Sequence, residues 1–160
     1  MALIGLIQDL YAANKDNQTF LHTRFALSQN VLEPYKKTLE RWLWPNVLRK
    51  QDTSVAKAKE VIASYQKAVG EPTGLAELLV YYCEMAAGFS EEVGNDEKVY
   101  LDTLVRMFAQ AVQVVEQLPE SDRPDLIARL NDVREISHNI GYSVGEDMDD
   151  IMGNSSLDVE

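Results

Sequence analysis

The sequence predicts an all-α fold, and two observations carry this prediction. Apolar residues recur at helical period along the whole chain, and no segment has the alternating pattern or paired turn residues of a β-hairpin. Glycine and proline stand almost wholly between the periodic segments, where helices end. We expect one all-helical domain over residues 1–152 and a flexible C-terminal tail over residues 153–160. About seven helices with short connections favour an antiparallel bundle or a short stack of helical hairpins.

The first three predicted helices cover the N-terminal third of the chain. Helical periodicity predicts a helix over residues 3–13 and a second over about residues 14–29. A third carries Pro34 near its first turn, where proline is tolerated, and is expected to stop at Pro45.

The fourth and fifth helices are separated by a clear break. Ser54 can cap the fourth, which ends at residue 69 with Gly70 just past it. The fifth spans residues 72–88 and is apolar on nearly all sides, so we expect it to be buried at the centre of the fold. Its only charges are Glu77 and Glu84, which lie seven residues apart on one stripe.

Three more segments complete the predicted fold. Asp96 caps a sixth helix that ends near residue 118, before Pro119. A seventh follows a cap at Ser121 or Asp122 and runs to about residue 140, and a last short turn covers residues 147–152.

A polar stripe on the second predicted helix is the most unusual feature of the sequence. Asn14, Asn17, Arg24 and Ser28 share one face with Leu21, and that face points where a core is expected. A core-facing arginine requires a hydrogen-bonded anionic partner. We therefore expect a buried cation at position 24 that is neutralised by a neighbouring helix.

Glu84 is the carboxylate that we expect to pair with Arg24, because it lies well inside the buried fifth helix beside Tyr81. A guanidinium can hold a carboxylate with two hydrogen bonds, which lysine cannot do. Two interpretations of this cluster stay open. It is a structural network that fixes helix register, or a pocket that holds a small anion on Arg24 with Glu84 as acid or base.

The polar stripe belongs to the run Tyr11-x-x-Asn14-x-x-Asn17-x-x-Phe20-Leu21-x-x-Arg24-Phe25. This run resembles the opening of a family of small bacterial all-helical proteins, a domain of unknown function, and weaker matches to it continue over nearly the whole chain. The resemblance implies a single all-helical domain and supplies no activity, substrate or catalytic residue.

Charge is distributed unevenly along the chain. Residues 1–70 carry a net charge of +4 and residues 71–160 carry −15, within a total of −11. Residues 36–67 combine basic side chains with aromatic ones, a composition that suits either a protein-interaction surface or weak nucleic-acid association. The overall acidity counts against nucleic acid. The candidate surface consists of Lys36, Lys37, Arg41, Trp42, Trp44, Lys57 and Lys59.

The remaining residues give little support to an enzyme. Cys83 stands among apolar residues, where burial blunts a thiol, and no nucleophile–base pattern accompanies His22 or His138. We expect no catalytic residue, no metal and no cofactor, because metal-ligand spacings and phosphate-binding glycine loops are missing from the pattern. The lone cysteine and the lack of a secretory or membrane-spanning pattern predict a cytoplasmic protein. The leading interpretation is a non-enzymatic helical domain that binds another protein, of unknown oligomeric state.

Overall fold

The computed structural model describes residues 27, 29–49, 53–93, 98–140 and 143–157, and these ranges are helical without a strand. The all-α prediction is confirmed for them. The helices predicted over residues 3–13 and 14–29 fall almost wholly outside the described residues. The elements are α3 (Gln29–Arg49), α4 (Thr53–Ala68), α5 (Pro72–Val93), α6 (Lys98–Glu116), the 3₁₀ turn η2 (Glu120–Asp122), α7 (Pro124–Ser137) and α8 (Val144–Gly153).

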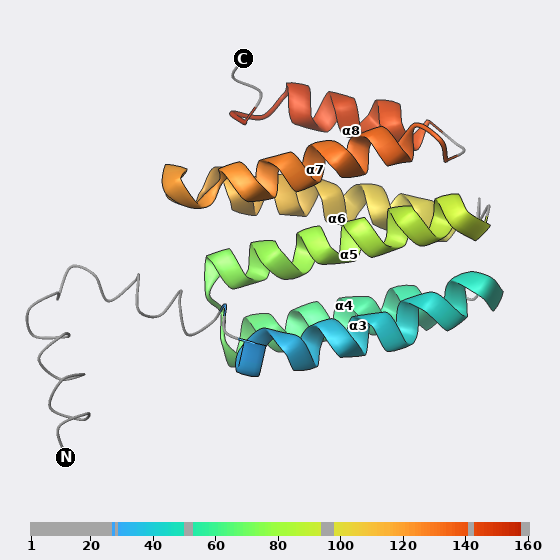
Figure 1. The fold of residues 1–160 in the computed structure, drawn as a ribbon, viewed down its shortest axis with the longest axis horizontal. Coiled ribbons are helices and arrows are strands. Elements are labelled where there is room, and N and C mark those ends of the chain that lie inside the picture. Colours follow the sequence, from blue (N-terminus) through green and yellow to red (C-terminus); the bar gives the residue numbers. More distant parts are fainter. Residues whose placement is uncertain (1–26, 28, 50–52, 94–97, 141–142, 158–160) are drawn as a thin grey trace, which may run out of the picture.

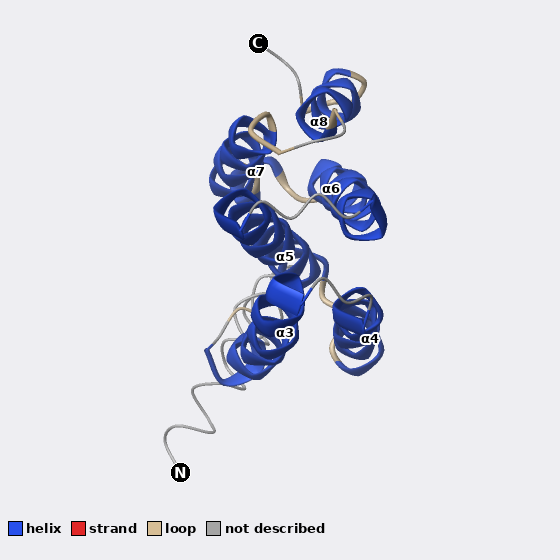
Figure 2. Ribbon diagram, turned by 90° about the vertical axis from the view of Figure 1, so that its right-hand side faces the viewer, coloured by secondary structure: helices blue, strands red, loops and turns tan. Residues whose placement is uncertain are grey.

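The six α-helices of the described ranges stand in two rows (Figures 1 and 2). One row contains α3, α5 and α7, and the other contains α4, α6 and α8. Helices that follow each other in the chain pack as pairs, α3 with α4, α5 with α6 and α7 with α8. Along the first row, α5 also packs against both α3 and α7. No helix in the described ranges is long and apolar enough to cross a membrane.

Helix α5 lies at the centre of the fold, as its apolar composition predicts. It contacts α3, α4, α6 and α7. The residues Ala76, Leu78, Leu79, Val80, Tyr82, Cys83, Ala86 and Ala87 are fully buried. The helix continues past Gly88 to Val93, beyond the predicted end, because a helix-interior glycine costs only about 1 kcal/mol and tertiary packing outweighs it.

Two other predicted helix bounds are wrong. Helix α3 runs through both Pro34 and Pro45 to Arg49, although each proline lacks an N–H for the helical ladder. Proline inside a helix therefore does not end α3 at Pro45. The N-cap of α7 is Arg123 rather than Ser121 or Asp122, which belong to the preceding turn.

Arg123 also completes the end of α6. Its Nε donates to the carbonyl oxygen of Leu118 at 2.9 Å, and its Nη2 donates to that of Glu116 at 2.8 Å. The last carbonyl groups of a helix have no partner within the helix, so a guanidinium that supplies donors stabilises the α6–α7 turn.

The C-terminal helix α8 is held against α7 by Asp149. Arg134 donates to this carboxylate at 3.0 Å, and the Nε2 of His138 lies 2.8 Å from its other oxygen. Partial burial alone would raise the pKa of Asp149, but the hydrogen bonds from Arg134 and His138 outweigh it and hold that pKa below its usual value. Beyond α8, Leu157 is buried and the Ser156 backbone N–H and hydroxyl donate to Glu116.

The turn between α4 and α5 shows why α4 ends and α5 begins there. Gly70 has φ +67°, a left-handed conformation in which a Cβ would lie 3.0 Å from the carbonyl oxygen of Gln66. The buried Glu71 then accepts hydrogen bonds from the backbone N–H groups of Thr73 (3.0 Å) and Gly74 (2.8 Å). Glu71 thus caps the central helix.

The cap gives the first testable prediction. We expect Glu71→Ala to lower the free energy of unfolding by about 1 kcal/mol or more, because two buried N–H groups lose their acceptor. Asp132→Ala is the control, since Asp132 is exposed on α7. Chemical denaturation of both variants measures the difference, and equal losses would rule out a capping role.

Candidate functional site

Part of the predicted polar cluster lies outside the described residues. Asn14, Asn17, Arg24 and Ser28 belong to this group, so the pairing of Arg24 with Glu84 stays a prediction. Within the described helices, the cation that binds Glu84 is Arg129 of α7.

Arg129 binds two carboxylates of α5 at once. Its Nη1 and Nη2 donate to the two oxygens of Glu77 at 2.7 and 2.8 Å. Its Nε and Nη2 donate to the two oxygens of Glu84 at 3.0 and 2.7 Å. The side chain of Arg129 is only 21% exposed, and that of Glu77 only 17%. A planar guanidinium is suited to this double bidentate contact, which an ammonium group cannot make.

Helix α3 adds a second cation to the same stripe of α5. The Nζ of Lys36 lies 3.3 Å from Glu77 and 4.9 Å from the centroid of the Tyr81 ring. The Tyr81 hydroxyl donates to Glu40 of α3. We refer to these residues as the Arg129 network, which consists of Lys36, Glu40, Glu77, Tyr81, Glu84 and Arg129.

The electrostatics of the Arg129 network favour a structural role. Burial would raise the pKa of Glu77, but hydrogen bonds and charge from Arg129 and Lys36 outweigh it and lower that pKa. The hydrogen bond with Glu84 contributes most to raising the pKa of Arg129. Burial and the contact with Glu40 raise the pKa of Tyr81. These three groups therefore hold their usual charge states near neutral pH, and none of them is poised to transfer a proton.

The candidate basic and aromatic residues of segment 36–67 lie in different surroundings. Lys36 belongs to the Arg129 network, and Lys57 lies 3.4 Å from Glu60. Lys37 and Arg41 are exposed on α3. The side chains of Trp42 and Trp44 lie outside the described part of the structure. Lys59 lines a cavity between two helices of the described structure.

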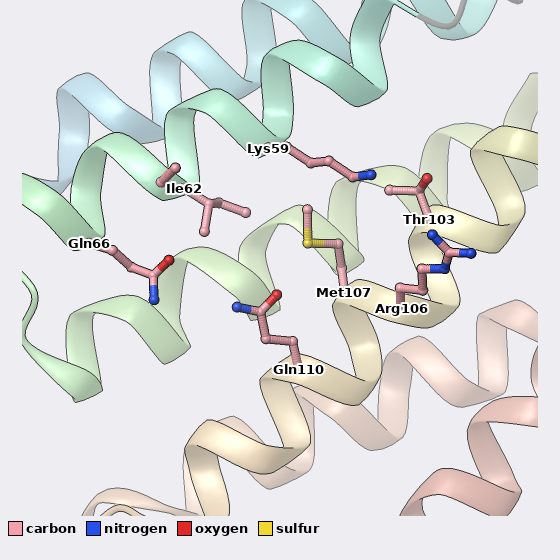
Figure 3. Close-up of a pocket in the computed structure, with 8 residues that line it drawn as sticks. Lys59, Ile62, Gln66, Thr103, Arg106, Met107 and Gln110 are labelled. Carbon is pink, nitrogen blue, oxygen red and sulfur yellow. The ribbon is translucent and has the colours of Figure 1, made fainter.

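A groove opens between α4 and α6, in the second row of helices (Figure 3). Its volume is about 280 Å³. These two helices are not among the closely packed pairs, whereas α6 and α8 beside them are. The lining residues are Lys59, Ile62, Ala63, Gln66, Thr103, Arg106, Met107 and Gln110.

The groove has distinct ends. Lys59 and Arg106 lie near Thr103 at one end, and Gln66 and Gln110 lie at the other (Figure 3). Between them, Ile62 and Met107 extend toward each other and form an apolar middle. The local pattern of basic and aromatic residues points to Lys59 but not to Arg106, which lies 47 positions further along the chain, because only the fold brings the two helices together.

Charge in the groove is of one sign. Lys59 and Arg106 are exposed, and no acidic residue of the described ranges lines the groove. Neither side chain has an ion pair or a hydrogen bond within those ranges. The groove therefore presents two cations on a protein whose net charge is −11.

Comparisons of the chain with protein-family models, with curated proteins and with solved structures found no match. The resemblance to the bacterial all-helical family accordingly stays a prediction. Among the described residues, no group of three or more His, Cys, Asp or Glu side chains is arranged to hold a metal ion.

A double-mutant cycle tests the Arg129 network. We expect Arg129→Ala to lower the free energy of unfolding by about 2 kcal/mol, because it leaves two half-buried carboxylates without their donors. Arg129→Lys should restore only part of the loss, since one ammonium cannot hold both carboxylates. If the losses in Arg129→Ala and Glu84→Ala simply add in the double variant, the two residues are not coupled.

The lowered pKa of Glu77 gives a pH dependence with a definite sign. A carboxyl whose pKa is lower in the folded state contributes stability above its unfolded value of about 4.3, and this contribution disappears as pH falls through the folded value. The stability difference between the wild type and Glu77→Gln should therefore shrink from pH 7 toward pH 3. Urea denaturation measures it, and the exposed Glu135→Gln serves as the control, for which a flat difference is expected.

Proposed function

We propose that this chain is a non-enzymatic helical domain that binds another protein, and that the partner docks in the groove between α4 and α6. The observation that carries the proposal is the combination of an apolar middle with two cations that have no partner in the described structure. Binding sites in proteins typically combine apolar surface with a few placed polar groups.

The rest of the described fold supports a scaffold role. We take the paired helices as a short stack of helical hairpins, a packing that presents elongated surfaces between neighbouring units. The Arg129 network links α3, α5 and α7, which form the first row of this stack. The groove between α4 and α6 of the second row is therefore supported by a row of helices whose relative positions are fixed. A groove with fixed walls loses little conformational freedom when a partner binds.

The reactive groups in the described ranges favour binding over catalysis. Cys83 is fully buried, and burial raises the pKa of its thiol, so it is a poor nucleophile. Glu77 and Glu84 have both carboxylate oxygens bound by Arg129. Lys36 is bound to Glu77, which leaves fewer free cations for nucleic acid. A single buried thiol also agrees with a cytoplasmic location.

Photo-crosslinking in bacterial cells tests the proposed function. Ala63 lines the groove and is exposed, so a photoreactive phenylalanine analogue at this position should yield a crosslink to a discrete second protein. The same analogue at Ala128, which is exposed on α7, is the control and should not give that adduct. Adding Arg106→Glu to the Ala63 probe should reduce the yield.

Two results would contradict the proposal. One is an adduct that forms equally from positions 63 and 128, since this would show non-specific collision. The other is an adduct from position 63 that Arg106→Glu leaves unchanged. Mass spectrometry of the adduct identifies the second protein and shows which of its segments reaches the groove.

A further inference from the structure

We infer that the partner segment is a short acidic amphipathic peptide, with a carboxylate at the Lys59–Arg106 end of the groove and an apolar side chain over Ile62 and Met107. This inference rests on the proposed function and adds to it the chemistry and the direction of the partner. It depends on three separate features of the groove.

The first feature is the pair of cations. Lys59 and Arg106 come from facing helices and lie at the same end of the groove (Figure 3). The described structure provides neither with a carboxylate, although the protein has an excess of acidic residues. A carboxylate between them gains a planar bidentate donor from the arginine and a point charge from the lysine.

The second feature is the apolar middle. Ile62 and Met107 are only 4% and 5% exposed, so they form a floor rather than a protruding surface. The cavity of about 280 Å³ is at the low end of ligand sites, which suits one or two side chains. Methionine adapts its shape to different apolar groups, so the floor accepts several aliphatic side chains. Nucleic acid would satisfy the cations but would bring no aliphatic group to this floor.

The third feature is the amide end. Gln66 and Gln110 each offer a carboxamide that both donates and accepts hydrogen bonds, which matches the groups of a peptide backbone. Cations at one end and amides at the other give the groove a direction. A peptide therefore binds with its acidic residue toward Lys59 and its chain passing Gln66.

Fluorescence anisotropy with defined probes tests this inference on the full chain. The probe is a labelled amphipathic peptide of about 14 residues, long enough for a full apolar stripe, composed of Glu, Leu, Ala and Gln. Its partner probe has Lys in place of every Glu. We expect the acidic peptide to bind and the basic peptide not to, with an affinity that falls as salt rises.

Variants of the protein locate the binding. The double variant K59E/R106E should weaken binding of the acidic peptide by about tenfold or more, because both attractive charges become repulsive. The matched control is K67E/Q113E/Q117E, which makes the same change in net charge at exposed residues outside the groove and should alter the affinity less than about twofold. K59Q/R106Q, which removes charge without reversing it, should fall between the two.

Four results would overturn the inference. Equal binding of the acidic and basic peptides would exclude an acidic partner, and equal losses in K59E/R106E and in the matched control would exclude the groove. Self-association in sedimentation experiments that K59E/R106E abolishes would assign the groove to a second copy of the chain. If peptide binding fails while the specific crosslink from position 63 persists, the proposed function stands and only this inference is wrong.

Discussion

The contact of Arg129 with Glu77 and Glu84 is the constraint on which the first row of helices depends. Seven residues in a helix correspond to a rise of about 10.5 Å, so the two carboxylates stand two turns apart on one stripe. A single guanidinium that binds both carboxylates can occupy only the position between them. This contact fixes the position of α7 along α5 and the rotation of α7 about its own axis. The same carboxylates would be costly without this partner on α5, which is the most apolar of the described helices. Charge therefore sets register here, while apolar burial supplies the bulk of the stability.

The two rows of helices are consequently unequal. In the first row, polar contacts supplement packing on both sides of α5, since Lys36 and Glu40 tie α3 to the stripe that Arg129 holds from α7. In the second row, α6 packs closely on α8, but the space toward α4 is a groove with exposed cations. Because α4 is held through α3 and α5 instead of through α6, the groove exists without loss of support on either wall.

The sequence predicts the fold class and the central helix because both depend on local pattern. Periodicity gives the helices, the all-round apolar composition of α5 gives its burial, and Gly70 marks a break that its positive φ confirms. The partner of Glu84 among the described helices is not predictable in the same way, because Arg129 lies 45 positions away and many cations compete for the role. Glu71 was not expected as a cap, since serine, threonine, aspartate and asparagine are the preferred residues there. The course of α3 through Pro45 runs against the local signal, since a proline inside a helix lacks the N–H that the helical ladder uses.

A cationic groove on a protein of negative net charge discriminates between partners in a way that neither the groove cations nor the net charge alone would. At distances beyond the Debye length of about 8 Å, salt screens the net charge of −11, so a partner responds mainly to the charges nearest to it. In the proposed mode of binding, a long, uniformly acidic partner would meet Lys59 and Arg106 with a few residues and would bring no apolar side chain to the floor of Ile62 and Met107. A short acidic segment that is followed by apolar residues would match both the cations and this floor. Under the proposed function, the groove therefore favours a partner segment in which a few acidic residues are followed by apolar ones.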